Sequence, residues 1–286
     1  MKVTRAALPF LPLCQRLFPS RLAGLSMALL KATALEIAIL AGHLLLYPSG
    51  IVQERRSAPP LPSPDAATLP TEAKPPVVLL HGFIDNRSVF LLLRRNLAQH
   101  GRQQVESLNY SPLTCDIRTA AELLGRHIEQ ICERTGQERV DIVGHSLGGL
   151  IARYYAQCLG GDARVRALVT LGTPHSGTRV IPLMNAHPIV RQMRPGSEVI
   201  EELRSPAPGC RTHFISFWSD LDHLMDPLET ACVDHPDLLT RNIRVSGVGH
   251  LALPVHPAVA AGIRQALDLA EPGVRAATPT GGLTVA

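Results

Sequence analysis

A serine between two glycines is the clearest catalytic candidate in this sequence. Ser146 stands within Gly144–Gly148, after the apolar residues 140–143 and before a stretch with helical spacing. The tight turn expected there would expose the serine at a helix N-terminus, where backbone N–H groups favour developing negative charge. These are the requirements of a serine nucleophile that attacks a carbonyl carbon.

A serine nucleophile needs a base, and the sequence contains 12 histidines. His250 follows the predicted strand 242–246, on a short glycine-containing loop before the last predicted helix, where a strand-end base should lie. His256 is a rival, but His256-Pro257 is typical of a helix start. The other histidines that we considered lie in turns or loops with different neighbours: His81, His175, His223 and His235. We expect His250 to be the base and His81 to be a structural turn residue.

Short apolar runs alternate with helical stretches along the chain. The runs typical of strands buried on both faces are 77–80, 140–144, 167–172, 213–218 and 242–246. Helical spacing occurs over 87–100, 117–134, 147–158 and 257–269. The alternation predicts an α/β fold with a mostly parallel sheet flanked by helices, and an active site at the carboxyl ends of the strands.

Three sequence blocks resemble the α/β-hydrolase-fold lipases and esterases, in that family's order. They are VVLLHGF at 77–83, DIVGHSLGGLIARYY at 141–155 and LVTLGTPHSGT at 168–178. The resemblance covers roughly residues 76–270 and is strongest to secreted or surface-attached triacylglycerol lipases of bacteria, of the actinobacterial type. It implies the α/β-hydrolase fold and a carboxylic ester hydrolase.

The resemblance also implies an acid that precedes the histidine in the chain. The family pattern is a serine, two residues, an aspartate, a few mostly apolar residues and a proline. Ser219 and Pro227 put Asp222 in that slot. Asp220 and Asp226 remain rivals on the same loop.

Two backbone N–H groups are expected to form an oxyanion hole. One belongs to Leu147, the residue after the nucleophile, and the other, by family resemblance, belongs to Phe83. The Phe83 side chain would then be part of the pocket wall. His145, beside the nucleophile, is a candidate substrate contact.

Residues 179–208 lie where this fold often carries cap helices, and a mobile apolar cap would suit a lipid substrate. The candidate acyl contacts in this segment are Ile181, Leu183, Met184, Ile189, Val190 and Met193. Ordinary packing of a surface helix explains the same apolar residues equally well.

The N-terminal residues 1–47 carry five basic residues and one acidic residue, which accounts for the whole net charge of +4. Residues 22–47 are apolar and exceed the ~20 residues that span a bilayer. Lys31 and Glu36 interrupt this stretch, and a central charge costs roughly 2.5–3.5 kcal/mol on insertion. We expect a membrane anchor that leaves the domain on the extracellular face. A cleaved export signal, with a secreted domain, or a helix packed on the membrane or on the domain are the alternatives.

The remaining boundaries follow from composition. Residues 48–76 contain eight prolines and read as an extended linker. We expect a catalytic domain over 77–272, which contains the cap, and a flexible C-terminal tail over 273–286.

Several classes of function are disfavoured by what the main domain lacks. Lysine does not occur after Lys74, so Schiff-base and Walker-type phosphate chemistry are disfavoured. Basic and acidic residues balance after residue 76, which argues against nucleic-acid binding. Cys210 and Cys232 flank the acid loop and could form a disulfide there. No Cys or His pair has zinc spacing, so we expect neither a metal nor a cofactor.

The sequence thus favours a serine hydrolase that cleaves carboxylic esters, most plausibly lipid esters, through Ser146, His250 and Asp222. An acyltransferase or a short-chain esterase would use the same three residues. A non-catalytic, membrane-tethered binding protein on a hydrolase scaffold is disfavoured, because all three are present in order.

Overall fold

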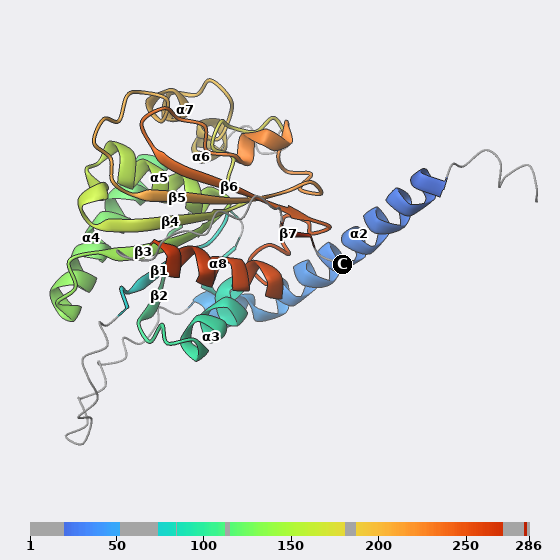
Figure 1. Cartoon of the computed structure of the whole chain (residues 1–286), viewed down its shortest axis with the longest axis horizontal. Helices are drawn as coiled ribbons and strands as arrows, with labels where there is room; N and C mark the ends of the chain where they lie inside the picture. Colours follow the sequence, from blue (N-terminus) through green and yellow to red (C-terminus); the bar gives the residue numbers. More distant parts are fainter. Residues whose placement is uncertain are drawn as a thin grey trace, which may run out of the picture.

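The computed structural model describes residues 20–51, 74–83, 85–111, 115–180, 187–270 and 283–284. Helices and strands alternate from the first strand onward (Figure 1). The elements up to the nucleophile helix are α2 (Ser20–Ile51), β1 (Val77–Leu80), η1 (Arg87–Phe90), α3 (Leu91–Gln99), β2 (Val105–Leu108), α4 (Ile117–Thr135), β3 (Val140–His145) and α5 (Leu147–Cys158). The later elements are η2 (Gly161–Ala163), β4 (Val165–Leu171), α6 (Pro188–Gln192), α7 (Glu198–Glu202), β5 (His213–Ser219), η3 (Leu228–Ala231), β6 (Leu239–Ser246), α8 (Pro257–Leu269) and β7 (Leu283–Thr284).

The strands form one parallel sheet in the order β2-β1-β3-β4-β5-β6-β7. Alternate residues of β1 face opposite cores, as the period of a strand requires. Val78 and Leu80 pack in the core that includes α4 and α5, whereas Val77 and Leu79 pack in the core that includes α3 and α8. The predicted α/β fold, with a parallel sheet flanked by helices, is therefore confirmed.

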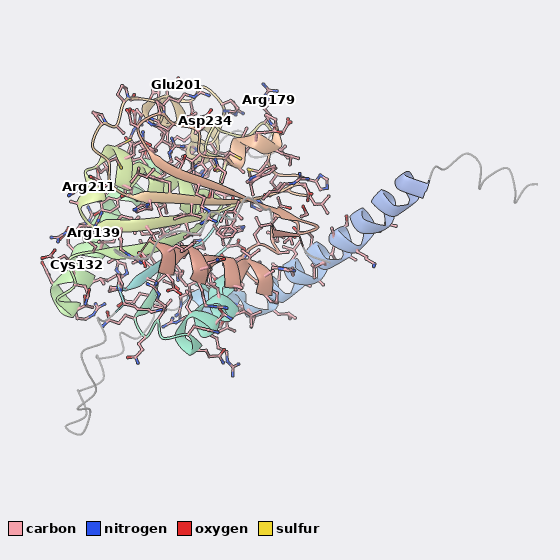
Figure 2. All side chains as sticks on the ribbon, viewed as in Figure 1. Cys132, Arg139, Arg179, Glu201, Arg211 and Asp234 are labelled. Atoms are coloured by element: carbon pink, nitrogen blue, oxygen red, sulfur yellow. The ribbon has the colours of Figure 1, made fainter. Side chains whose placement is uncertain are left out.

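The amino ends and the carboxyl ends of the strands lie at opposite sides of this sheet, called here its amino edge and its carboxyl edge. Arg139 and Arg211, which precede β3 and β5, mark the amino edge and lie close together in Figure 2. All strands run from there toward the opposite, carboxyl edge, where the loops after β1, β3, β5 and β6 meet. Phe83, Ser146, Asp222 and His250 lie on these four loops.

Two strands carry no apolar run that would reveal them in the sequence. β2 has Glu106 and Ser107 at its centre and only Val105 is buried, which is compatible with its place at the edge of the sheet. β7 pairs Leu283 and Thr284 with the end of β6. It lies within the segment 273–286 that composition predicts to be a flexible tail.

Helix α2 continues past the predicted boundary at residue 47 and includes Pro48, which corrects that part of the linker assignment. A proline inside a helix removes one backbone hydrogen bond, so this end needs other support. The domain supplies it. The side-chain amide of Asn86 donates to the Tyr47 carbonyl (2.9 Å), and that of Asn109 donates to the Gly50 carbonyl (2.6 Å).

The stretch Leu30–Ile51 of α2 is long and apolar enough to cross a membrane, with a mean hydropathy of 1.5. Figure 1 shows the C-terminal part of α2 passing beside α3 while its N-terminal part projects away from the domain. An N-terminal apolar helix is thus present, as expected, and it is consistent with either a signal sequence or an anchor.

Candidate active site

The predicted nucleophile lies in a strained turn between β3 and α5. Among the residues that the structure describes, Ser146 is the one non-glycine residue with a positive φ, at φ 51° and ψ −120°. A Cβ at Gly144 would lie 2.6 Å from Gly149 Cα, and one at Gly148 would lie 2.4 Å from the Leu80 carbonyl oxygen. Only glycine fits these two positions, which explains the Gly-x-Ser-x-Gly pattern. Such strain is tolerated mainly where function requires it.

His250 and Asp222 meet at the same edge of the sheet. Asp222 Oδ2 lies 2.7 Å from His250 Nδ1, and Asp222 Oδ1 accepts the Leu224 N–H at 3.0 Å. Both side chains are buried. A Cβ at Gly172 would lie 2.7 Å from Asp222 Oδ2 and 3.0 Å from His250 Nδ1, so a glycine is needed beside this pair.

The environment favours the protonated form of His250. Burial by itself would lower the pKa of His250, but the adjacent Asp222 carboxylate outweighs burial and raises it. Glu36 and Asp85 contribute in the same direction. An imidazole whose pKa is raised and which is held by a buried carboxylate is suited to accept a proton from a hydroxyl.

The rival aspartates have other roles. Asp220 forms an ion pair with Arg244 (2.9 Å) and accepts the Gly247 N–H (3.1 Å). Asp226 is exposed. Of the three, Asp222 alone contacts His250, although its catalytic role stays a prediction.

The rival histidines likewise have other surroundings. His175 Nε2 lies 2.9 Å from Thr170 Oγ1, and His256 caps the N-terminus of α8 by accepting the Ala258 N–H. His81 stacks on Tyr110, with ring centroids 4.4 Å apart, in keeping with a structural turn residue.

The two expected oxyanion donors flank the serine. Leu147 is the first residue of α5, where the helix N-terminus presents its N–H groups. Gly82 brings the chain before Phe83 close to the nucleophile, since a Cβ at Gly82 would lie 3.4 Å from Ser146 Cβ. The Phe83 ring makes an edge contact with His187 at the start of α6, so it touches the cap segment.

His145 does not line an open surface. It is 1% exposed, and its Nε2 lies 3.2 Å from the His250 carbonyl oxygen. Its ring lies 4.8 Å from the His250 ring. This position does not support the expected substrate contact. It indicates instead that His145 supports the backbone of the His250 loop.

A second buried carboxylate, Asp85, lies behind this histidine pair. Its oxygens are 3.6 Å from His145 Nδ1 and 3.5 Å from His43 Nδ1 on α2. Both separations exceed a good hydrogen bond but allow charge attraction. Burial alone would raise the pKa of Asp85, but the two imidazoles outweigh burial and lower it below its ordinary value.

Helix α2 supplies a third carboxylate, which local sequence reasoning does not assign to the site. Glu36 accepts the backbone N–H groups of Leu251 and Ala252, each at 2.9 Å. The available signal was that Glu36 and His43 are polar residues within an apolar helix, where a buried polar partner is expected.

The cap residues divide into two groups. Ile181, Leu183 and Met184 lie outside the described residues. The other three candidates are at most 2% exposed and belong to the core that includes α4 and α5: Ile189, Val190 and Met193. For these three, the burial agrees with ordinary packing.

Cys210 and Cys232 are free thiols, so the considered disulfide is absent and does not hold the acid loop. Within the described ranges, no group of three or more His, Cys, Asp or Glu side chains is arranged to hold a metal ion.

Comparison with protein families and curated proteins gives partial matches. The family described as alpha/beta hydrolase fold matches residues 75–205. A triacylglycerol lipase of Burkholderia plantarii is 32% identical over 126 residues, which cover 41% of this chain and 34% of that protein. A triacylglycerol lipase of Pseudarthrobacter phenanthrenivorans is 32% identical over 111 residues, which cover 36% and 34%. The chain thus spans about a third of the length of these relatives.

Solved structures share the fold at low identity. The mature lipase BlEst2 of Bacillus licheniformis superposes with a TM-score of 0.60 and 16% identity, over 73% of this chain and 96% of that one. Lipase B of Aspergillus fumigatus gives 0.58 and 18%, over 72% and 55%. These structures agree with the predicted fold.

Proposed function

We propose that this chain, which has the α/β-hydrolase fold and is distantly homologous to bacterial triacylglycerol lipases, is a serine hydrolase of carboxylic esters. The observation that carries the proposal is the 2.7 Å contact between Asp222 and His250, beside the strained turn of Ser146. Nucleophile, base and acid occur in the chain order typical of this fold.

The proposed mechanism has two halves. His250 Nδ1 is held by Asp222, which leaves Nε2 to accept the proton of Ser146 as its oxygen attacks the ester carbonyl. The negative charge on the carbonyl oxygen would be stabilised by the N–H groups of Phe83 and Leu147. The protonated His250 then donates to the leaving alkoxide, which departs as the alcohol and leaves an acyl-enzyme. His250 then takes a proton from a water molecule, whose oxygen attacks the acyl carbon. The bond to Ser146 Oγ breaks, His250 returns the proton to Oγ, and the carboxylic acid leaves.

We propose lipid esters as the substrate class. The distant relatives are triacylglycerol lipases. A second, independent support is the outward face of α2, which exposes large apolar side chains: Leu30, Leu35, Ile37, Leu40, Leu44, Leu45, Leu46, Tyr47 and Ile51. An exposed apolar face of this kind suits a lipid surface.

The same helix suggests how the domain meets a membrane. Glu36, His43 and Gly50 of α2 contact the domain, so this stretch does not face lipid on all sides. We therefore favour a helix that lies between the domain and the membrane surface over one that spans the bilayer along this stretch. Such contacts also favour a retained helix over a cleaved signal. The proposed location is the surface of a membrane.

A test needs one covalent and one kinetic measurement. A fluorophosphonate probe should label the wild type at Ser146 and should not label Ser146→Ala, while both proteins show the same circular dichroism. The p-nitrophenyl esters of increasing chain length, with and without vesicles, then define the substrate. A preference for long chains and a gain from vesicles supports a lipase, whereas short soluble esters with no gain support an esterase.

Transfer to an added alcohol in place of hydrolysis would support the acyltransferase alternative. A wild-type protein that fails to label, and hydrolyses no ester, would favour the non-catalytic binding protein.

A further inference from the structure

We infer that Glu36 of helix α2 is a positioning residue for the catalytic histidine, so that the N-terminal helix completes the active site. The catalytic part of this inference rests on the proposed function, whereas its geometric part rests on the contacts that α2 makes with the domain.

The Glu36 carboxylate holds the chain directly after His250. Its two oxygens accept the N–H groups of Leu251 and Ala252, one each, at 2.9 Å. Adjacent backbone donors that bind one carboxylate fix the orientation of both peptide planes. Because these peptides directly follow the catalytic histidine, their orientation restricts where its Cα and ring can lie.

The site is shaped to admit this carboxylate. A Cβ at Gly249 would lie 2.5 Å from the carboxyl carbon of Glu36. No side chain larger than hydrogen fits there without displacing Glu36. The absence of a side chain at Gly249 thus leaves the space that the Glu36 carboxylate occupies beside the His250 loop.

The docked face of α2 repeats at helical spacing. Ala32, His43 and Gly50 are buried, Glu36 is half-buried, and Ile39 packs against the core that includes α3 and α8. These positions lie on one side of a helix with 3.6 residues per turn. A seated helix therefore delivers Glu36 to the His250 loop and His43 to Asp85 together.

Four charged or titratable groups face His250 from the elements around it. Asp222 comes from the loop after β5, Glu36 from α2, Asp85 from the loop after β1, and His145 from β3. The three carboxylates favour the protonated imidazole, whereas His145 is a second imidazole that opposes it. Removing the charge of Glu36 should lower the pKa of His250 and leave Asp222 in place.

The test uses the full-length protein and a soluble p-nitrophenyl ester, so that lipid contact does not enter. Glu36→Gln keeps the shape but removes the charge and one acceptor. We expect kcat to fall about tenfold to hundredfold, as for a slightly misplaced catalytic group, with KM little changed. The acid limb of kcat/KM should shift to lower pH, because His250 then deprotonates at lower pH.

Gly249→Ala provides a second route to the same result, since its new methyl group displaces Glu36 without altering it. The controls are Glu133→Gln, at an exposed site on α4, and Gly42→Ala on α2, where a Cβ would meet nothing within 4 Å. Both controls should behave as the wild type.

An NMR titration of His250, assigned by His250→Asn, separates this inference from the proposed function. A lower pKa of His250 in Glu36→Gln supports the positioning role even if the wild type hydrolyses no ester. An active wild type, with kcat and the His250 titration unchanged in both Glu36→Gln and Gly249→Ala, would overturn it.

Discussion

Asp141 and Asp222 are two fully buried aspartates at opposite edges of the same sheet, and they have different partners. Asp141, near the start of β3, is bound by Arg102 (2.8 Å) and by Arg166 (2.9 and 2.6 Å). Asp222, after β5, is bound by His250. Arginine does not release its proton at ordinary pH, whereas histidine does. Asp141 at the amino edge is therefore paired with side chains that stay protonated. Asp222 at the carboxyl edge is paired with a side chain that can gain and lose a proton.

The largest expected effect tests the carboxyl edge. Asp222→Asn should lower kcat about 10⁴-fold, because the amide favours the wrong tautomer of His250. The free energy of unfolding should change little, since a neutral His250 leaves no buried charge without a partner. Steady-state kinetics and urea unfolding measure both.

Asp220→Asn is the matched control on the same loop. It should lose only the ion pair with Arg244 and keep activity within a few-fold. If Asp220→Asn is the inactive variant, the assignment of the acid is wrong.

The second effect tests the amino edge. Asp141→Asn should destabilise the fold by about 3–5 kcal/mol, because it removes the buried carboxylate that Arg102 and Arg166 share, and Asp268 pairs with Arg102 but not with Arg166. The folded fraction should keep its kcat, because the change lies at the far edge from the site. Urea midpoints measure the loss of stability, and kinetics at low temperature measure the kcat of the folded fraction. An Asp141→Asn variant as stable as the wild type but inactive would contradict the different roles assigned to the two edges.

A smaller effect concerns pH. The pKa of His250 is raised above 6.5 by Asp222, and the protonated ring cannot accept the serine proton. The value of kcat/KM should therefore fall as pH drops through a midpoint above 6.5. Asp141→Asn should not move this midpoint, while the residual activity of Asp222→Asn should show a lower one. A midpoint below 6.5 in the wild type would contradict the raised pKa.

The smallest effect concerns the lipid surface. Leu44 and Leu45 of α2 are 66% and 82% exposed, and α2 adjoins the carboxyl edge. Replacing both with Asn should weaken binding to vesicles in a flotation assay and leave hydrolysis of a soluble ester unchanged. Equal flotation of the variant and the wild type would argue against this face as the contact.

The sequence predicts best what local pattern determines. Buried strands of a parallel sheet are apolar on both faces, so β1, β3, β4 and β5 are visible as largely apolar runs, and the turn around Ser146 is visible through its glycines. The edge strand β2 is half-exposed and polar at Glu106, so it lacks this signal.

Long-range contacts have no such pattern. Asp141 reads as an exception within an apolar strand, and its arginine partners lie 39 and 25 residues away. Glu36 looks like an unexplained charge in an apolar segment when only its neighbours in the sequence are considered, because the loop that it binds lies more than 200 residues later. His145 reads as a substrate contact because it adjoins Ser146, while the fold buries it beneath His250.

The distance along the chain between Glu36 and its partners sets an order of events during synthesis. Glu36 and Leu251 are 215 residues apart, so their contact cannot form until nearly the whole catalytic domain has been made. The helix emerges from the ribosome early, and the loop that it binds emerges late. A chain interrupted before residue 250 would carry Glu36, Ser146 and Asp222 but not the histidine loop that Glu36 binds. The contact between α2 and this loop would then form only after most of the domain has been synthesised.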